Sequence, residues 1–229
     1  MSDAVATTEL EQRLRGVLER NYHHLHPFNQ AMHRGGLSKE QIRGWIANRF
    51  YYQQNIPVKD ALLLAKLPLE YRRVWISRIY THDGQGDDQG GLETWLALGD
   101  AAGIEREVLL DNSDVVPGVR FAVDAYVNFV RDQPWFDGVA SSLTELFAPL
   151  IMRDRTAAFL EHYTWLAPDG LQYFRNRMSQ APREADHALA IVTKHATSRA
   201  LEDRAVTALE FKCNVLWALL DAITTAYGD

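Results

Sequence analysis

The residues that could do chemistry are concentrated on one face of a predicted helix in the first third of the chain. Arg49, Tyr52 and Gln53 lie three and four positions apart, so in a helix they share a face, which Trp45 and Ile56 extend. A guanidinium, a phenol and a carboxamide set among rings would form one wall of a pocket for a flat, oxygen-rich anion. The alternative is a helix whose arginine reaches water while its tyrosine packs in the core.

The same combination of a cation with an aromatic or hydrogen-bonding side chain recurs in other predicted helices. Arg78 lies one turn before His82, and Tyr173 lies one turn before Arg177. Surface pairing within a helix would explain any single pair. Their recurrence predicts that cations from different helices meet in a shared interior, where a polyanionic ligand would offset a burial cost of several kcal/mol for each unpaired cation. Five further residues are expected at the same interior: Lys59, Glu145, Met152, Arg155 and Lys212.

Spacing also relates three members of this set that follow one another in the chain. Met152 and Arg155 follow Glu145 by seven and ten positions, which places the three on roughly one helical face. We therefore expect them to point toward the same interior.

His82 is predicted to end a helix and to precede the glycine-rich segment 83–91. An imidazole there could transfer protons near neutral pH, or it could be a basic residue that the helix C-terminus favours. Segment 83–91 lacks the ligand spacing of a calcium loop, and no strand precedes it as in a dinucleotide-binding loop. It is therefore predicted to be a solvated turn.

Metal and thiol chemistry have little support in the sequence. Glu184 and His187 form one Glu-x-x-His step, whereas a di-iron bundle uses two such steps and further glutamates. The three histidines between Tyr22 and Pro27 suit hydrogen bonding or capping better than metal binding. Cys213 lies among apolar residues and is interpreted as a small buried hydrophobe, not a nucleophile.

The elements that must position these residues are all predicted to be helices. Ser38 and Gln41 form a capping box that opens the helix carrying Arg49, and Pro57 is expected to kink it. No stretch alternates as a strand, and no repeat or linker divides the chain. We expect residues 1–229 to form one all-α domain, a compact bundle of about seven helices. The expected helical segments are 7–20, 28–34, a long one that starts near Ser38 and carries Arg49, 69–81, 92–102, 118–132, 135–147, 150–163, 171–180, 183–195 and 200–227.

Composition restricts the class of protein. A hydrophobic content of 47% supports a sizeable core, and a formal net charge of −6 argues against a nucleic-acid surface. No apolar run approaches the roughly 20 residues that a membrane helix needs, and the N-terminus lacks the basic and apolar parts of a signal peptide. One cysteine excludes an internal disulfide. We expect a cytoplasmic protein with neither nucleic-acid nor membrane partners.

Several long and unusual strings connect the chain to a known family. They are segments 45–53, 56–60, 117–126, 141–149, 173–177 and 211–212. In these strings the chain, from about Tyr22 to its end, resembles the pyrroloquinoline-quinone synthases. The resemblance implies a haem-oxygenase-like, thiaminase-type helical fold, usually as a homodimer. It also implies ring closure and an eight-electron oxidation of a bicyclic precursor bearing several carboxylates, with O2 as oxidant, H2O2 as a product, and no metal or flavin.

The resemblance implies roles for individual residues as well. His82 would move protons, Tyr173 and Arg177 would handle oxygen, and Glu145 would orient a donor or manage a proton. Relatives carry a further tail after the position of Asp229, which would cover part of the site. The implied substrate-binding residues are Tyr22, His23, Arg49, Tyr52, Gln53, Lys59, Arg78, Tyr126, Arg155 and Lys212.

Met152 departs from the family pattern, because the family has a histidine there that helps to build the oxygen pocket. Methionine neither donates nor accepts a proton usefully. Two alternatives to the cofactor-independent oxidase therefore stay open. One is an iron-dependent oxygenase on the same scaffold, using groups such as His82 and Glu145. The other is a protein that binds substrate or product but whose oxidation step Met152 has impaired.

Overall fold

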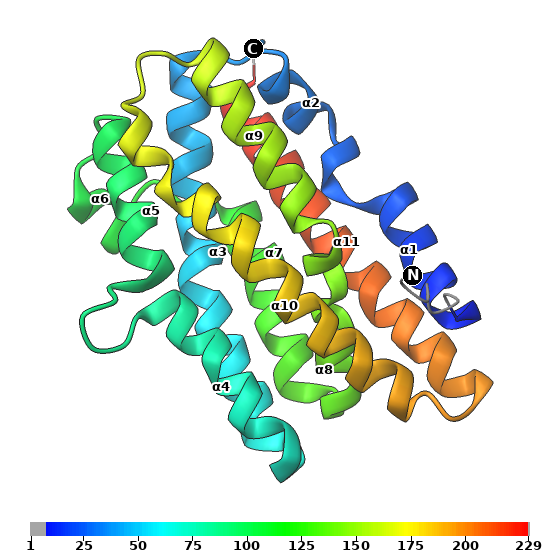
Figure 1. Ribbon diagram of the computed structural model, residues 1–229. Coiled ribbons are helices and arrows are strands. Elements are labelled where there is room, and N and C mark those ends of the chain that lie inside the picture. The colour runs from blue at the N-terminus through cyan, green and yellow to red at the C-terminus, as the bar shows by residue number, and fades with distance from the viewer. Residues whose placement is uncertain (1–7, 229) are drawn as a thin grey trace, which may run out of the picture.

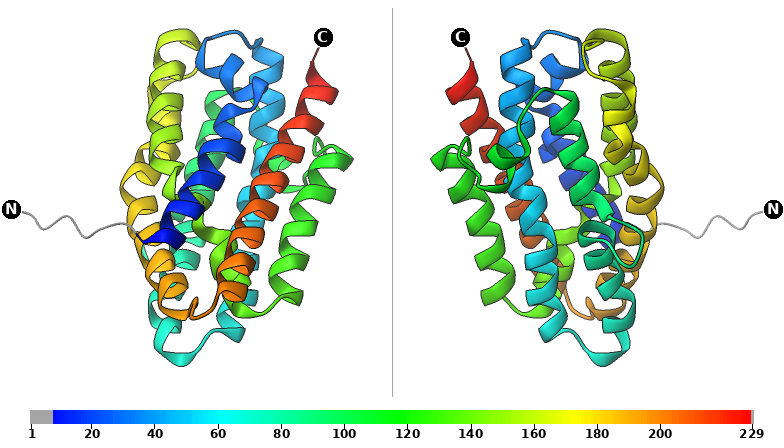
Figure 2. Two further views of the ribbon diagram at one scale, coloured as in Figure 1. Left: turned by 90° about the vertical axis from the view of Figure 1, so that its right-hand side faces the viewer. Right: turned by 90° about the vertical axis from the view of Figure 1, so that its left-hand side faces the viewer.

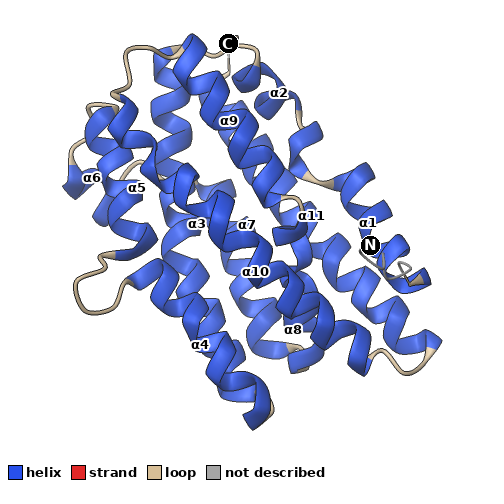
Figure 3. Cartoon of the chain, in the orientation of Figure 1, coloured by secondary structure: helices blue, strands red, loops and turns tan. Residues whose placement is uncertain are grey.

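The computed structural model describes residues 8–228, and in this range every regular element is a helix (Figure 3). The predicted all-α fold class is therefore confirmed, although the described range holds more helices than the expected seven. The first residue of the predicted helix 7–20 and the N-terminal segment before it lie outside the described residues. The α-helices are α1 (Glu9–Asn21), α2 (Pro27–His33), α3 (Lys39–Lys66), α4 (Leu69–Asp83), α5 (Gly90–Ala101), α6 (Arg106–Leu110), α7 (Pro117–Asp132), α8 (Trp135–Ser141), α9 (Ala148–His162), α10 (Gln172–His195) and α11 (Arg199–Tyr227); the 3-10 helices are η1 (His23–Leu25), η2 (Ser142–Leu146) and η3 (Pro168–Leu171).

The longest helices, α3, α10 and α11, form the framework of the bundle. Figure 1 shows α9 and α10 on the near side, with α1 and α2 at one flank and α5 and α6 at the other. α10 packs on α9, α11 packs on α7 and α8, and α3 packs between α4 and α7. The side views in Figure 2 show most of these helices running in nearly the same direction. Helices far apart in the sequence thus share one interior. No helix among residues 8–228 has both the length and the apolar composition needed to cross a bilayer.

Helix α3 begins where the sequence predicts. The Ser38 hydroxyl accepts a hydrogen bond from the Gln41 backbone N–H, and the Gln41 carboxamide accepts one from the Ser38 N–H. This capping box satisfies two N–H groups that the first turn leaves without partners. The helix then continues to Lys66 with Pro57 inside it. One long rigid element therefore presents Arg49, Tyr52 and Gln53 together.

Helix α10 differs from the prediction, which placed one helix before Pro182 and another after it. The structure has a single helix through this proline. An internal proline removes a backbone hydrogen bond and costs about 3 kcal/mol in a helix interior. The apolar face that buries Ala181, Ala185 and Ile191 on both sides of it offsets this cost, because it packs continuously against the rest of the bundle.

The predicted helix 135–147 is also wrong in its second half. It ends at Ser141 as α8, and η2 follows before α9 starts at Ala148. Pro149 lies in the first turn of α9, where its missing N–H has no intrahelical partner to lose. Glu145 therefore lies in η2, whereas Met152 and Arg155 lie in α9, so these three do not share one helical face.

An aromatic cluster fixes the helices that carry the polar interior. The rings of Trp45, Trp95, Phe159 and Phe174 come from α3, α5, α9 and α10. Their centroids lie 5.4 Å apart for Trp45 and Trp95, and 5.6 Å apart for Phe159 and Phe174. All four side chains are at most 1% exposed. Burying such side chains contributes about 1.5–3 kcal/mol each, so the cluster holds the four helices in a fixed relationship.

A tight turn directly after His82 ends α4. Gly84 and Gly90 have φ values of +89° and +74°, a region that favours glycine. A Cβ at Gly84 would lie 2.4 Å from the Asp88 carbonyl oxygen, and one at Gly90 would lie 2.4 Å from the Gly84 nitrogen. Only glycine fits both positions, so this turn, which the sequence predicted, holds the end of α4 and the start of α5 together.

Candidate active site

Ten of the sequence-predicted residues line one cavity in the interior of the bundle, which we call the His82 chamber. It is bounded by the α1–α2 connection and by α3, α4, η2, α9, α10 and α11, so segments from most of the chain contribute. The sequence did not single out Thr144, Ala148 and Leu216, which also line it. The predicted residues in the wall are Tyr22, His23, Arg49, Tyr52, Gln53, His82, Glu145, Met152, Tyr173 and Arg177.

The chamber is nearly filled by its own side chains. Its free volume is about 30 Å³, whereas pockets for small organic ligands are roughly 300–1,000 Å³. Two hydrogen bonds hold the wall together, from Lys212 Nζ to the Tyr52 hydroxyl at 2.7 Å and from the Tyr173 hydroxyl to Gln53 Oε1 at 2.8 Å. A bicyclic ligand would therefore enter only as these side chains exchange their mutual hydrogen bonds for bonds to the ligand.

Three buried cations have no carboxylate partner among the described residues: Arg49 lines the chamber, whereas Arg155 and Lys212 lie behind its wall. Arg49, Arg155 and Lys212 are 7%, 2% and 1% exposed. The Arg49 guanidinium lies 4.0 Å from the Tyr52 ring centroid, and its Nη1 has no hydrogen-bond partner within residues 8–228. Arg155 lies 4.8 Å from the Trp45 ring centroid, and Lys212 lies 3.5 Å from that of Tyr126. Ring faces and neutral acceptors replace only part of the water that these cations lose.

The cost of this burial shows in the pKa values. Burial, followed by the positive charge of Arg49, lowers the pKa of Arg155 to about 9. The same two causes, in the same order, together with the charge of Lys59, lower the pKa of Lys212 well below its ordinary value. A bound anion would reverse these shifts, because it favours the charged form of each group.

Two other predicted cations, Lys59 and Arg78, carry their own counter-ions. Lys59 Nζ lies 2.6 Å from Asp60 Oδ1, and Arg78 Nε lies 3.7 Å from the same oxygen. Lys59, Arg78 and Tyr126 are buried but lie behind the chamber wall, not in it. The charges of Lys59 and Arg78 are balanced within the protein. The buried positive charge that lacks a counter-ion is therefore that of Arg49, Arg155 and Lys212.

His82 presents an unprotonated nitrogen in the chamber wall. Its Nδ1 lies 3.0 Å from the Arg78 backbone oxygen, which can only accept, so Nδ1 carries the proton. Nε2 has no hydrogen-bond partner among residues 8–228. Burial and then the charge of Arg177 lower the pKa of His82 to about 4, against the raising effect of Glu184. The imidazole is thus a neutral base whose free lone pair is on Nε2.

Arg177 lies next to His82 and binds two carboxylates. Its Nη2 donates to Glu145 Oε2 at 2.7 Å and to Glu184 Oε2 at 2.9 Å. Arg177, Tyr173 and His82 also line a second small cavity on the other side, next to the glycine turn. These three side chains therefore form a thin wall between the chamber and a polar recess.

Glu184 is a candidate site residue that the sequence indicated only as half of a single Glu-x-x-His step, a weak metal signal. It lies 3.7 Å from Arg78 as well as binding Arg177, instead of forming a metal pair with His187. It follows Arg177 by seven residues, a two-turn spacing that would have indicated the pair had α10 been predicted as one helix. Across residues 8–228 no three histidine, cysteine or carboxylate side chains are grouped as metal ligands would be.

Cys213 behaves as the sequence predicted. It is fully buried, and burial raises the pKa of its thiol to about 12. It does not line the chamber. A thiol with so high a pKa is a poor nucleophile, since the thiolate is the reactive form.

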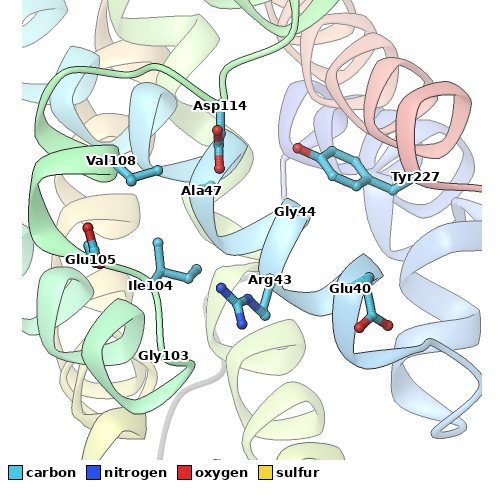
Figure 4. Close-up of a pocket in the computed structure, with 10 residues that line it drawn as sticks. All are labelled: Glu40, Arg43, Gly44, Ala47, Gly103, Ile104, Glu105, Val108, Asp114 and Tyr227. Atoms are coloured by element: carbon cyan, nitrogen blue, oxygen red, sulfur yellow. The ribbon is translucent and has the colours of Figure 1, made fainter.

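A larger cavity lies elsewhere and has different chemistry. It measures about 370 Å³ and is formed by the first half of α3, the loops on either side of α6, and the end of α11 (Figure 4). Figure 4 shows Arg43 and Glu40 on the same helix, with the Tyr227 ring to one side of that helix and Ile104 and Glu105 to the other. It contains no histidine, and its acidic side chains are exposed. Convergent buried cations and a neutral base distinguish the smaller His82 chamber as the candidate active site.

Solved structures of similar shape support the fold. A TenA homolog from Pseudomonas syringae pv. tomato matches with a TM-score of 0.74 at 14% identity, over 96% of this chain and 94% of that one. A domain of unknown function with a heme oxygenase-like fold from Shewanella denitrificans matches with a TM-score of 0.75 at 15% identity, over 98% and 94% of the two chains. These likenesses confirm the predicted haem-oxygenase-like architecture.

Curated relatives are much more similar in sequence. A pyrroloquinoline-quinone synthase from Ectopseudomonas mendocina is 51% identical over 99% of this chain and 91% of its own length. Another from Pseudomonas aeruginosa is 50% identical over 98% and 90% of the two lengths. The model of the TENA/THI-4/PQQC family matches residues 11–222, which include every residue of the chamber wall. On this sequence match, and on the helical fold that agrees with it, the chain belongs to the TENA/THI-4/PQQC family.

Proposed function

We propose that this chain is a cofactor-independent oxidase that converts a bicyclic, multi-carboxylate precursor into pyrroloquinoline quinone by ring closure and eight-electron oxidation, with O2 as oxidant and H2O2 as a product. The observation that carries the proposal is the set of buried cations without carboxylate partners, Arg49, Arg155 and Lys212, beside the neutral base His82. The similarity to curated pyrroloquinoline-quinone synthases supplies the class of substrate.

The substrate carboxylates would provide the counter-charge that the chamber lacks. Arginine can bind a carboxylate through two parallel hydrogen bonds, which fixes orientation as well as position. The Tyr52 and Gln53 side chains, freed from Lys212 and Tyr173, would then bind the remaining oxygens. We therefore expect a ligand with several carboxylates to bind more tightly in this chamber than a ligand with one.

His82 would accept the protons that leave carbon and nitrogen during ring closure and dehydrogenation. Its Nε2 lone pair is available because Nδ1 donates to the Arg78 carbonyl oxygen. The pKa of about 4 describes the empty chamber. Negative charge on a bound substrate would raise it toward neutrality, where a base both accepts and returns protons efficiently.

Oxygen reduction needs positive charge and proton donors close to the reduced ring. Each O2 that leaves as H2O2 takes up two electrons from the ring and two protons. Arg177 supplies fixed positive charge at the chamber wall, and the Tyr173 hydroxyl supplies a hydrogen-bond donor there. Glu145 accepts a 2.7 Å hydrogen bond from Arg177 and so helps to hold this donor at the wall.

The test supplies the precursor and air to protein freed of metal with a chelator. We expect quinone absorbance, oxygen uptake and peroxide release in constant proportion. The His82→Gln variant should lose most of the rate, whereas His162→Gln, on the outer part of α9, should keep it. Activity that disappears with the chelator and returns with added iron would instead establish the iron-dependent oxygenase.

A second candidate function has one observation in its favour. Met152 lines the chamber and is 8% exposed, so no imidazole occupies that part of the wall. The chain would then bind substrate or product without completing the oxidation. Tight binding of pyrroloquinoline quinone together with absent turnover would support this candidate.

The proposal includes a homodimer. Large exposed apolar side chains, such as Leu69 and Phe121, are available to an interface. Light scattering on the purified protein measures the molecular mass and tests this point. The cytoplasmic location stays a prediction.

A further inference from the structure

A buried asparagine connects two groups of the chamber that come from distant parts of the chain. Asn29, in the first turn of α2, is fully buried. Its Oδ1 lies 2.9 Å from Nη2 of Arg155 on α9. Its Nδ2 lies 2.7 Å from the backbone oxygen of His23 and 3.1 Å from the His23 Nδ1.

The chemistry of these neighbours determines the orientation of the Asn29 amide. A guanidinium has only donors, so the atom facing Arg155 must be the acceptor Oδ1. A backbone carbonyl only accepts, so the atom facing the His23 oxygen must be the donor Nδ2. Both ends of the amide give the same assignment, and neither depends on the unknown protonation of an imidazole.

The orientation of Asn29 in turn determines which nitrogen of His23 carries the proton. Because Nδ2 donates toward Nδ1, that nitrogen must be an unprotonated acceptor. Burial, followed by the charges of Arg49, Arg155 and Lys212, lowers the pKa of His23 well below its ordinary value, so the imidazole is neutral. A neutral imidazole without a proton on Nδ1 carries it on Nε2.

His23 and His82 therefore offer opposite chemistry to a ligand. Both line the chamber. His82 is protonated on Nδ1 because it faces the Arg78 carbonyl, which leaves a lone pair on Nε2. His23 is protonated on Nε2 because it faces the Asn29 amide. One histidine accepts a proton, and the other donates a hydrogen bond.

We propose that Asn29 is a positioning residue that makes His23 a hydrogen-bond donor and holds the charge of Arg155 behind it, so that this part of the chamber selects a ligand carboxylate and disfavours a ligand donor group. A carboxylate has only acceptor oxygens, so it would accept from His23 and be stabilised by the nearby charge of Arg155. An ammonium or an alcohol proton pointing at His23 Nε2–H would leave two donors facing each other, which costs the desolvation of both. The identity of the ligand rests on the function proposed above, whereas the tautomer of His23 does not.

Nitrogen NMR of histidine labelled with 15N measures the tautomer directly in the intact protein. We expect the His23 resonances of the unmutated protein to show a protonated Nε2 and an unprotonated Nδ1, and those of His82 to show the reverse. In Asn29→Asp, a carboxylate faces the imidazole and accepts from Nδ1, so the proton of His23 should appear on Nδ1. A protonated Nδ1 on His23 in the unmutated protein would overturn the proposal.

Binding of pyrroloquinoline quinone, measured by calorimetry, provides the functional readout. Asn29→Leu should weaken binding at least about tenfold, because one hydrogen bond to a charged group is worth about 1.5–3 kcal/mol. Asn48→Leu is the matched control, since Asn48 is equally buried but binds Asp114, Val116 and Tyr227 away from the chamber. It should lower stability and leave affinity unchanged.

The outcomes separate the two proposals. If the unmutated protein does not bind pyrroloquinoline quinone while His23 shows a protonated Nε2, the proposed function fails and the tautomer assignment stands. If the quinone binds and Asn29→Leu binds it equally tightly, Asn29 is not a positioning residue. Should Asn29→Leu not fold, Asn29→Ser replaces it, since the smaller side chain leaves room for a water molecule.

Discussion

Arg177 donates two hydrogen bonds to the carboxylate of Glu184, from Nη1 to Oε1 at 3.1 Å and from Nη2 to Oε2 at 2.9 Å. This two-point contact fixes the plane of the guanidinium, which a single bond to Glu145 would leave free to rotate. The side chain that is proposed to stabilise reduced oxygen is therefore oriented by a residue outside the chamber wall.

Glu184→Gln tests this orientation. It removes a buried charge that both Arg177 and Arg78 face, and breaking a buried ion pair costs about 3 kcal/mol of unfolding free energy. We expect a lower kcat and a higher KM for O2 with little change in KM for the precursor, measured by oxygen-dependent steady-state kinetics. Glu70→Gln breaks an exposed pair with Lys194 and should change neither stability nor rate. Equal effects of the two variants would contradict the assignment.

Removing a buried cation from behind the chamber wall should raise stability while weakening binding. Lys212 is 1% exposed and has no carboxylate partner among the described residues, so Lys212→Met eliminates an unfavourable burial. We expect the denaturant midpoint of the empty protein to rise, by about 1 kcal/mol or more in unfolding free energy. Affinity for pyrroloquinoline quinone should fall at least about tenfold. Lys39→Met, at the surface, should change neither the denaturant midpoint nor the affinity. A less stable Lys212→Met protein would show that the ammonium is satisfied without a ligand.

Stability should decrease as the pH falls from 6.5 to 4. The pKa of His82 is about 4 in the folded protein and about 6.5 in an unfolded chain, so within this window only the unfolded state takes up the proton. Proton uptake by the unfolded chain therefore lowers the free energy of unfolding progressively as the pH drops, by at most about 3 kcal/mol. His33, with a pKa of about 4, acts in the same direction. Denaturant unfolding at several pH values measures the slope, which should be smaller in His82→Gln.

Ligand binding should be accompanied by proton uptake. Burial and neighbouring cations lower the pKa values of Lys212 and Arg155, and burial and Arg177 lower that of His82. A polycarboxylate raises all three pKa values, so His82, which is neutral in the empty chamber at neutral pH because its pKa is about 4, gains a proton on binding. Calorimetric titration with pyrroloquinoline quinone in buffers of different ionisation enthalpy gives the number of protons taken up. Proton release, or no dependence on the buffer, would contradict this electrostatic account.

Met152→His tests whether the departure from the family pattern limits oxidation. Met152 lies in the chamber wall, and an imidazole there would add a group that can transfer protons. We expect the rate of product formation to rise at least about tenfold, with unchanged affinity for the quinone. Met178→His, on α10 outside the chamber, is the control. An unchanged rate would show that the chain completes the oxidation without a histidine at this position.

The sequence alone determined the helical architecture and one wall of the site. The capping box at Ser38 and the apolar period of α3 are local signals, because helix ends and helix faces depend on residues within a few positions of one another. The shared face of Arg49, Tyr52 and Gln53 follows from the same geometry. These features are confirmed because nothing distant in the chain competes with them.

Only the tertiary structure decided which charges the protein balances by itself. Sequence reasoning treated Lys59, Arg78 and Lys212 alike, whereas packing pairs Lys59 and Arg78 with Asp60 and leaves Lys212 with the Tyr52 hydroxyl. The continuation of α10 through Pro182 depended on packing in the same way, and with it the contact between Arg177 and Glu184. Pairing across the bundle joins residues more than 100 positions apart, such as Asn29 and Arg155, and no local period encodes it. The physical reason is that the partner of a buried charge is determined by how the helices dock, which follows from the shape of the whole core.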